Sequence, residues 1–435
     1  MKSRTLTLLT TMTLFAALAV PVRLAAQEQK QDLPHYTVTD LGTLGGTFSL
    51  AGGLSNSGWV EGYSTLPGDT VEHAFLWRKG AMIDLGTLGG PNSDASWRPN
   101  NRGNAGGGSD TTTLDPNAEN FCGHGTNLIC LPFLWRNSTK KMTALPTLGG
   151  NNAWVAGVNN WDAAVGVAEN NKVEPTCAGT SQVLQFKPAL WIWGRVYPLP
   201  TFPGDPVGNA YSINDWGQAT GSSGNCRADL HALLWQNGKA LDLGSLGGTR
   251  KTGVDINNQG QVVGDSLLPG DNAYHAFLWQ RGVMTDLGTL PGDISSTGEG
   301  INSKGQVVGG SYDASGNPRP FLWQDGVMTD LNTLIPPNSP LYLLEATGTI
   351  NDRGQIAGYA LVISTGEVHA FLATPTTTHW AISDRPKVLE ERISSSPGVP
   401  LISRSSGTVI SCSTSSAARP GIWVVTRAAT SPSSG

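Results

Sequence analysis

The sequence of 435 residues carries little charge and has no concentration of charge of one sign. Asp, Glu, Lys and Arg together make up 14% of the chain, which is low for a protein built from amphipathic helices. The net charge is -5 and no run of Lys or Arg occurs, so the basic stripe of a protein that binds nucleic-acid phosphates is missing. We therefore expect neither a helical protein nor a nucleic-acid partner.

The chain also lacks the short motifs that identify common catalytic sites. It contains no GxSxG, no HExxH, no phosphate-binding loop and no dinucleotide-binding motif. No DxDxDG run is present, so calcium is an alternative supported only by carboxylates in loops, and no other cofactor or metal is predicted. No pair of acidic residues has a diagnostic spacing. The sequence therefore favours a binding protein over an enzyme.

Residues 1–26 have the pattern of a secretory signal peptide. Lys2 and Arg4 precede an apolar stretch, residues 6–20, that is too short to span a bilayer. We expect cleavage after Ala26, with cleavage after Ala19 as the alternative, and a short linker at 27–35. No Cys directly follows the apolar stretch to carry a lipid, and no later apolar run reaches about 18 residues. The mature protein is expected to be secreted or periplasmic, without membrane insertion.

Glycine and tryptophan are abundant, with 55 and 14 residues respectively, and the tryptophans recur in an internal repeat. The segment Phe-Leu-Trp, or a variant of it, begins at seven positions that lie 44 to 58 residues apart. These positions are Phe75, Phe133, Ala189, Leu233, Phe277, Phe321 and Phe371. A period of this length is typical of the four-stranded blades of a β-propeller and exceeds that of most helical repeats.

One period, residues 252–290, contains four extended segments, which we call strands a to d: TGVDIN, QVVGDS, HAFLW and VMTDLGTL. We expect tight turns between a and b (257–260) and between c and d (280–282), where Asn and Gly would supply the positive φ of a hairpin. Strand c is apolar on both faces, so both faces of its sheet must be buried. Sheets arranged radially, each between two neighbours, meet this condition without covering helices.

The two ends of the repeat complement one another. The last copy, HAFLA at 369–373, has no strand d, whereas YTVTDLGTLGG at 36–46 is a strand d without a strand c before it. We therefore predict an all-β fold, a seven-bladed β-propeller of four-stranded antiparallel blades over residues 36–375, in which residues 36–44 complete the last blade. Residues 376–435 are rich in Ser, Thr, Pro and Arg and are expected to form a disordered tail.

These residues resemble the HAF repeat family, which is named for the His-Ala-Phe found here at 73–75, 275–277 and 369–371. Leu and Trp follow this tripeptide in two of the three copies, and then DLGTLGG or DLGTLPG. The resemblance covers roughly residues 36–375 and implies an extracellular repeat protein of bacterial type, without an established activity to carry over. The repeated His73, His231, His275 and His369 occupy one strand-end position. They lie in different blades and cannot converge, so we expect them to be structural.

Irregular sequence is concentrated in the b–c and d–a links, which emerge on one face of such a ring; we call this face the variable side. Long loops on a rigid scaffold are where binding sites are normally placed, and the longest links here are 110–131 and 168–187. The ionisable residues that break the repeat are the binding candidates. They are Asp110, Asp115, Glu119, His124, Glu169, Glu174 and Asp229.

Four of the five cysteines also lie in these links. Secretion favours disulfides, and we expect Cys122 to pair with Cys130 and Cys177 with Cys226, leaving Cys412 unpaired. A zinc site formed by Cys122, His124 and Cys130 is the alternative, although no CxxC pair supports it. Pro-Gly-Asp recurs at 67–69, 203–205, 269–271 and 291–293, where turn chemistry explains the Asp.

The function predicted from the sequence is that of a secreted binding or scaffold protein. Its disulfide-braced loops would hold an extracellular glycan, a peptide or a cell-surface partner, and the protein would be a monomer. The alternative is an extracellular propeller hydrolase or lyase with carboxylates at the mouth of the ring. An aromatic shelf would favour binding, whereas a carboxylate pair at catalytic separation would favour the enzyme.

Overall fold

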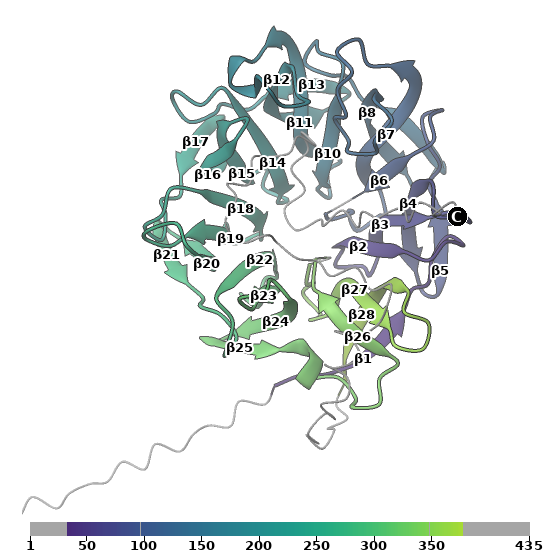
Figure 1. The fold of residues 1–435 in the computed structure, drawn as a ribbon, viewed down its shortest axis with the longest axis vertical. Helices are drawn as coiled ribbons and strands as arrows, with labels where there is room; N and C mark the ends of the chain where they lie inside the picture. The colour runs from purple at the N-terminus through teal and green to yellow at the C-terminus, as the bar shows by residue number, and fades with distance from the viewer. Residues whose placement is uncertain (1–32, 96, 348, 377–435) are drawn as a thin grey trace, which may run out of the picture. The chain divides into compact units, whose positions relative to one another are not determined.

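A computed structural model describes residues 33–95, 97–347 and 349–376, which contain 28 β-strands and two short 3-10 helices. The strands form seven four-stranded sheets, arranged as blades in a ring (Figure 1). The predicted seven-bladed β-propeller is confirmed. The predicted signal peptide (1–26), most of the linker, the tail after Thr376 and Cys412 lie outside the described residues.

Each blade runs from strand a at the centre to strand d at the rim. Blade 1 contains β2 (Ser49–Leu54), β3 (Val60–Thr65), β4 (Glu72–Arg78) and β5 (Ala81–Asp84), and blade 2 contains β6 (Ser93–Ala95), β7 (Ala105–Leu114), β8 (Leu128–Arg136) and β9 (Lys141–Ala144). Blade 3 contains β10 (Ala153–Val158), β11 (Ala164–Val173), β12 (Leu184–Ile192) and β13 (Arg195–Pro198), and blade 4 contains β14 (Val207–Ile213), β15 (Ala219–Asn225), β16 (Ala228–Gln236) and β17 (Lys239–Asp242). Blade 5 contains β18 (Lys251–Ile256), β19 (Val262–Leu267), β20 (Tyr274–Gln280) and β21 (Val283–Asp286), and blade 6 contains β22 (Ser295–Ile301), β23 (Val307–Tyr312), β24 (Pro318–Gln324) and β25 (Val327–Asp330). Blade 7 contains β26 (Leu341–Glu345), β27 (Ile356–Val362), β28 (Val368–Thr376) and β1 (His35–Asp40), and the 3-10 helices are η1 (Pro175–Cys177) and η2 (Leu331–Thr333).

The N-terminal strand closes the ring, as the incomplete repeats predict. Strand β1 pairs with β28 in antiparallel register, from His35 opposite Thr376 to Asp40 opposite Phe371. Its only buried side chain is Tyr36, which is fully buried. Blade 7 therefore takes its outermost strand from the far end of the chain.

Three of the four repeated His residues join strand c to the adjacent strand d. The Nδ1 atoms of His73, His275 and His369 each lie 2.9 Å from a carboxylate oxygen of the Asp that ends strand d, and for His369 that residue is Asp40. The pKa of His369 is raised mainly by its hydrogen bond to Asp40. His231 bonds instead to Asp205, at 2.8 Å. The expected structural role of this His is therefore confirmed in all four blades.

Strand c is buried on both faces, as its apolar pattern requires. Phe75 and Trp77 pack with Leu372 of blade 7, whereas Ala74 and Leu76 pack with Phe133 of blade 2. The blades thus stack face to face around the ring, with large aromatic side chains alternating with small or branched ones. Among the described residues, no helix has the length and apolar character needed to cross a membrane.

The innermost strands of six blades share a bulge that leaves one residue of each strand unpaired. The a–b register shifts in every blade except blade 2, where β6 is short and pairs without a shift. In blade 2 the chain instead places Trp97, with a φ of 98°, so that its backbone N–H donates to the carbonyl of Gly52, in the bulge of blade 1, at 2.8 Å. The Trp97 ring stacks on Tyr211 at 5.4 Å and meets Trp154 edge-on at 5.7 Å, so Trp97 fills the centre of the ring beside blades 3 and 4.

Candidate functional site

The a–b turns are joined by a chain of Asn side chains that runs around the ring. The first residue of the turn is Asn in blades 2 to 7 and Ser55 in blade 1. Each Asn Nδ2 donates to the backbone carbonyl of the first residue of the next turn, at 2.9 to 3.2 Å. The donors are Asn100, Asn159, Asn214, Asn257, Asn302 and Asn351. These bonds fix the spacing of the seven turns.

The same Asn residues hold their own turns by a mechanism that differs from the predicted one. Asn257 Oδ1 accepts from the backbone N–H groups of Gln259 and Gln261, at 3.0 Å each, and the other Asn residues repeat this pattern. The positive φ belongs to Gly260 and its counterparts and not to the Asn, so the prediction that Asn supplies it in the a–b turn was wrong. An Asn side chain that accepts from the following N–H groups has no need of a left-handed backbone.

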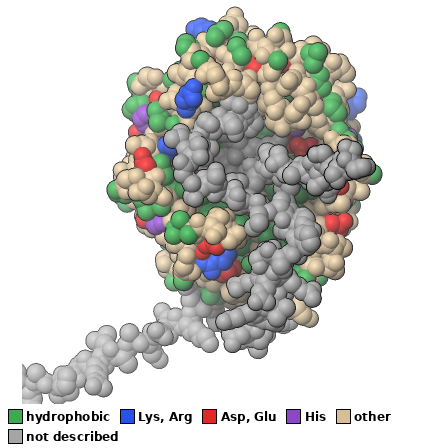
Figure 2. Space-filling model, viewed as in Figure 1, with side chains coloured by type: hydrophobic (Ala, Val, Ile, Leu, Met, Phe, Trp, Pro, Cys, Tyr) green, Lys and Arg blue, Asp and Glu red, His purple; other side chains and the backbone are tan. Residues whose placement is uncertain are grey.

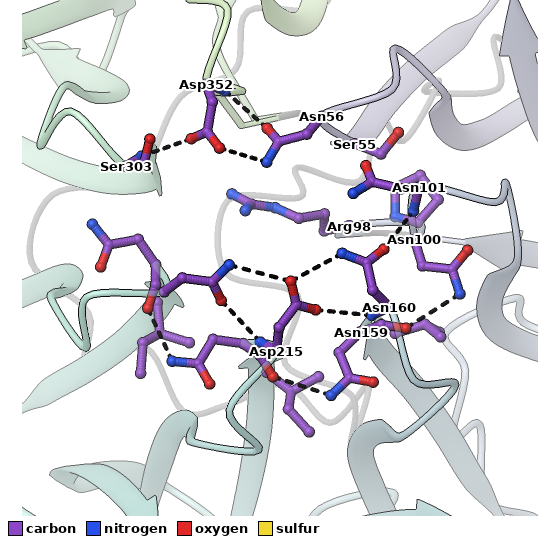
Figure 3. Close-up of a pocket in the computed structure, with 17 residues that line it drawn as sticks. Ser55, Asn56, Arg98, Asn100, Asn101, Asn159, Asn160, Asp215, Ser303 and Asp352 are labelled. Carbon is purple, nitrogen blue, oxygen red and sulfur yellow. Dashed lines mark hydrogen bonds between the residues drawn. The ribbon is translucent and has the colours of Figure 1, made fainter.

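A polar pocket lies inside this ring of turns (Figure 3). Its empty volume is about 510 Å³, which includes space that is open to solvent. The second residue of each turn forms much of its rim, and two of these residues, Asp215 and Asp352, are acidic. Asp215 accepts from the backbone and side chain of Asn160 at 3.0 and 2.9 Å, and Asp352 accepts from Asn56 Nδ2 at 2.6 Å. Both carboxylates are therefore held in place by neighbouring turns.

Arg98 lies between these two carboxylates in Figure 3 and forms a buried ion pair. Its Nη2 atom lies 2.8 Å from Asp255 Oδ2, and the two side chains are 25% and 1% exposed. Asp255 also accepts from Ser212 Oγ at 2.7 Å and from the backbone N–H of Ile301 at 3.0 Å. The pair links blade 2 to blade 5 across the centre of the ring and brings a cation to the pocket.

Two exposed tryptophans stand beside the pocket. Trp161 and Trp216 are the third residues of the a–b turns of blades 3 and 4 and are 76% and 77% exposed. Each indole N–H donates to a backbone carbonyl of the next turn, Trp161 to Asp215 at 3.1 Å and Trp216 to Asn258 at 3.0 Å. The rings are thus anchored at the nitrogen, with most of their surface left to solvent. A large exposed aromatic surface of this kind is a candidate binding site.

This surface, formed by the pocket with Trp161 and Trp216, was not among the sequence candidates and is called here the a–b turn site. The turn sequences NNWD (159–162) and NDWG (214–217) show both tryptophans, but a turn motif alone does not place them next to one another. Trp193, in the c–d turn of blade 3, is 89% exposed. In antiparallel blades the c–d turns emerge on the same face as the a–b turns.

The sequence candidates lie on the variable side, where most of them are buried. The predicted loops are shorter than expected, because β7 and β11 extend to Leu114 and Val173 and leave links of 115–127 and 174–183. Both predicted disulfides are present, Cys122–Cys130 within blade 2 and Cys177–Cys226 between blades 3 and 4. Because Cys122 and Cys130 are bonded to one another, the zinc site that used both thiols is excluded.

Three of the acidic candidates form one buried network. Glu119 Oε1 accepts from the backbone N–H groups of Val183 and Leu184 at 2.6 and 2.7 Å, which ties the link of blade 2 to that of blade 3. Gln182 Nε2 donates to both Glu119 and Glu169, at 3.0 and 2.6 Å. The third member is Asp115, which shares the donor Asn152 with Glu169. Burial, followed by the charge of Glu119, raises the pKa of Glu169 to about 8.

The shifted pKa of Glu169 predicts a specific pH dependence of stability. Its ordinary pKa of 4.5 applies to the unfolded chain, so the folded protein holds the proton more tightly. The contribution of this group to stability is therefore full below pH 4.5 and is lost as the pH rises through about 8. We expect the Tm of the wild-type protein to fall between pH 5 and pH 8. In Glu169→Gln, whose side chain is uncharged at every pH, this fall in Tm should be at most half as large. The exposed turn variant Asp325→Asn should keep the wild-type profile; equal profiles for all three proteins would contradict this.

The remaining candidates occupy separate positions. Glu174 caps η1 by accepting from the backbone N–H of Thr176 at 3.0 Å. Asp229 accepts from Ser222 Oγ at 2.8 Å, and burial raises its pKa. Asp110 and His124 meet at 2.8 Å between Oδ1 and Nδ1. The structure therefore groups the seven candidates into a network, a pair and two isolated residues, rather than into one open site.

Charge does not define a partner surface on the face shown in Figure 2. Lys and Arg side chains are scattered there among Asp and Glu, and the described residues visible on this face form no broad region of one sign. Recurring Asp residues in the Pro-Gly-Asp turns are engaged as predicted. Asp69, for example, accepts from the backbone N–H of Thr47 at 2.7 Å.

No known family model and no curated protein matches this chain. Solved structures are similar to it at low identity. An acylaminoacyl peptidase from Pyrococcus horikoshii matches with 9% identity and a TM-score of 0.43, over 79% of this chain and 54% of the peptidase. A puromycin-hydrolyzing peptidase from Mycobacterium tuberculosis matches with 10% identity and a TM-score of 0.41, over 78% of this chain and 56% of that one. An oligogalacturonate lyase in complex with manganese matches with 10% identity and a TM-score of 0.41, over 79% and 97% of the two chains. The chain thus spans about half the length of the two peptidases.

Proposed function

We propose that this protein is an extracellular binding propeller that holds a glycan at the a–b turn site. The observation that carries the proposal is the pair of exposed indoles, Trp161 and Trp216, anchored beside a pocket lined by amides and carboxylates. A sugar ring has an apolar C–H face that packs on an indole, and its hydroxyl groups both donate and accept hydrogen bonds. The site offers both kinds of contact on rigid turns.

A glycan explains the composition of this site better than a protein partner does. The centre of a protein interface is usually depleted of charged groups and enriched in apolar ones. Here the centre holds Arg98, Asp215 and Asp352 among Asn side chains, and the aromatic rings belong to two of the turns that line it. Polar groups fixed in advance cost little ordering on binding, and the chain of Asn bonds supplies that rigidity.

Two disulfides support an extracellular or periplasmic location for this binding protein. Cys122–Cys130 and Cys177–Cys226 are of the kind that persists in oxidising compartments. The signal-like pattern of residues 1–26 agrees with that location. We infer that the protein is exported and meets its ligand outside the cytoplasmic membrane.

The proposal predicts that the tryptophans dominate affinity. Pooled cell-surface polysaccharides should be retained by the wild-type protein, and the retained glycan should then be titrated by calorimetry. We expect Trp161→Ala and Trp216→Ala each to weaken binding about tenfold or more, because truncating an aromatic anchor at a binding site has effects of that order. Both variants should keep the wild-type Tm, since the two rings are largely exposed.

A matched control and a second readout make this test decisive. Leu114, 70% exposed at the end of β7 on the variable side, provides the control, and Leu114→Ala should bind like wild type. Retained and released material should also be sized by mass spectrometry. New fragments would indicate the hydrolase or lyase alternative, and unchanged affinity in both tryptophan variants would refute a glycan site at the a–b turns.

A further inference from the structure

Three side chains from separate segments converge on the variable side, between blades 1 and 2. Glu72 begins β4, Asp94 lies in β6, and His124 belongs to the link between β7 and β8. His124 Nε2 lies 3.5 Å from Asp94 Oδ2 and 3.8 Å from Glu72 Oε1. One ligand atom from each residue lies within 4.8 Å of the other two. The three groups therefore surround one point.

His124 supplies the observation that points to a ligand at this position. Its side chain is 1% exposed, and its Nε2 atom makes no hydrogen bond. The nearest acceptor, Asp94 Oδ2 at 3.5 Å, is beyond the range of a normal N–H···O bond. A buried imidazole nitrogen rarely remains without a partner. The nitrogen faces the two carboxylates across a gap that a small cation would fill.

The other side of the imidazole is arranged as it is in known metal centres. Nδ1 of His124 lies 2.8 Å from Asp110 Oδ1, and Asp110 Oδ2 accepts from Asn92 Nδ2 and Thr126 Oγ1 at 3.1 Å each. A carboxylate that accepts the Nδ1–H fixes the tautomer with the Nε2 lone pair exposed and orients the ring toward the metal. Asp94 Oδ1 similarly accepts from Trp154 Nε1 at 2.6 Å, which positions Oδ2.

We propose that Glu72, Asp94 and His124 form a Zn²⁺ site, with Asp110 as the residue that positions His124. Tetrahedral Zn²⁺ with ligand bonds of about 2.0–2.2 Å requires its ligand atoms to lie about 3.3–3.5 Å apart. The observed separations of 3.5 and 3.8 Å are close to that spacing. One imidazole nitrogen with two carboxylate oxygens suits Zn²⁺, whereas Ca²⁺ takes oxygen ligands.

Three protein ligands would leave the fourth position of the ion to water. Glu72 is 25% exposed, while Asp94 and His124 are each 1% exposed, so that position and the entry path would lie on the side of Glu72. The ion would join strand c of blade 1 to strand a and the b–c link of blade 2. It would lie on the variable side, away from the a–b turn site, so this inference is independent of the proposed glycan binding.

The competing explanation is that His124 is simply a protonated partner of these acids. Burial lowers its pKa, but the hydrogen bond to Asp110 and the nearby carboxylates of Asp94 and Glu72 outweigh that effect and raise it to about 9. The same carboxylates that favour a proton on Nε2 would favour a divalent cation there. An experiment that measures the metal directly therefore distinguishes the two.

Calorimetric titration of the untagged protein, after chelator treatment, tests the site. We expect one Zn²⁺ per chain, a higher Tm with Zn²⁺ than without, and no competition from Ca²⁺ at equal concentration. Glu72→Gln lies at the edge of the site and should fold, and we expect it to weaken Zn²⁺ binding at least tenfold. Co²⁺ should give the absorption bands of a tetrahedral site in wild type and lose them in His124→Gln.

A second histidine provides the matched control. His73 also bonds to a carboxylate, Asp84, at 2.9 Å, but belongs to the repeated structural pairs. His73→Gln should bind Zn²⁺ with wild-type affinity. The proposal is overturned if wild type takes up less than one Zn²⁺ per chain, if Ca²⁺ displaces the ion, or if Glu72→Gln and His73→Gln bind Zn²⁺ equally well.

Discussion

Removing residues 33–40 will lower the free energy of unfolding by at least about 5 kcal/mol, because it takes β1 out of blade 7. Truncating a single buried aromatic side chain costs about 3–5 kcal/mol, and Tyr36 is fully buried. The deletion also removes the bond between His369 and Asp40 and all of the pairing with β28. It leaves β28 as an exposed edge strand, which can pair with a strand of another molecule and so cause aggregation. Denaturant unfolding and light scattering would measure both effects.

A circularly permuted protein distinguishes the effect of opening the ring from the effect of removing residues 33–40. His35 lies opposite Thr376, so a two-residue Asn-Gly turn could join Thr376 directly to His35, as Arg281-Gly282 joins β20 to β21. A chain that begins at Leu41 and carries residues 35–40 after this turn should regain most of the lost stability. If the deletion variant unfolds like wild type, or if the permuted chain is no more stable than the deletion variant, closure by β1 does not stabilise the ring.

Arg98→Met will lower the free energy of unfolding by about 3 kcal/mol, the lower end of the range for breaking a buried ion pair. The lower end applies because the Arg98 side chain is 25% exposed. The variant leaves Asp255, 1% exposed, with only the neutral donors Ser212 and Ile301 N–H. An uncompensated buried carboxylate is costly, whereas a neutral amide in its place is not. The double variant Arg98→Met/Asp255→Asn should therefore be more stable than Arg98→Met alone.

The control for this prediction is a cation on the same face. Arg102 pairs with Asp162 at 2.7 Å, but its side chain is 55% exposed. Exposed pairs of this kind contribute about 0–1 kcal/mol, so Arg102→Met should be nearly neutral by urea unfolding. If Arg98→Met were as mild as Arg102→Met, the link between blades 2 and 5 would be incidental to stability.

The ring and its closure could be predicted because they follow from local pattern and counting. Strand c is apolar on both faces, and the unmatched strand d at 36–46 complements the unmatched strand c at 369–373. Both disulfides could be predicted because Cys122, Cys130, Cys177 and Cys226 lie in links that share one face. The order of the strands in a blade is enough to place the unmatched strands beside one another and the links that carry the cysteines on one face.

The centre of the ring could not be predicted, because its contacts depend on how far each turn lies from the next. The recurring Asn at the start of the a–b turns was visible, but its bond to the neighbouring blade exists only once the ring is closed. The position of Trp97 at the centre of the ring could not be predicted for a similar reason. Its segment, DASWRPN, has Trp at the position that holds Gly52, Ala156, Tyr211, Val254 and Glu299 in other blades, so no shared residue type at this position predicts which side chain fills the centre.

The burial of the acidic candidates could not be predicted, because sequence irregularity does not reveal exposure. Glu119 and Glu169 break the repeat, yet both are fully buried and hold two links together. Glu61 is another acidic residue whose burial could not be predicted from the sequence. It stands in β3 where β19 and β23 have Val263 and Val308, and it is fully buried with a raised pKa caused by desolvation.

The position of β1 also has a consequence for the time course of biosynthesis. Asp40 is made early, and its partner His369 follows 329 residues later. At ordinary rates of translation this interval is on the order of tens of seconds. Throughout it the nascent β1 has no partner strand, and an unpaired strand is a target for other chains. Its sequence, HYTVTD, has one side chain that is buried in the final fold and several polar ones. A strand of this composition is less prone to aggregate with other chains during the time in which it is unpaired.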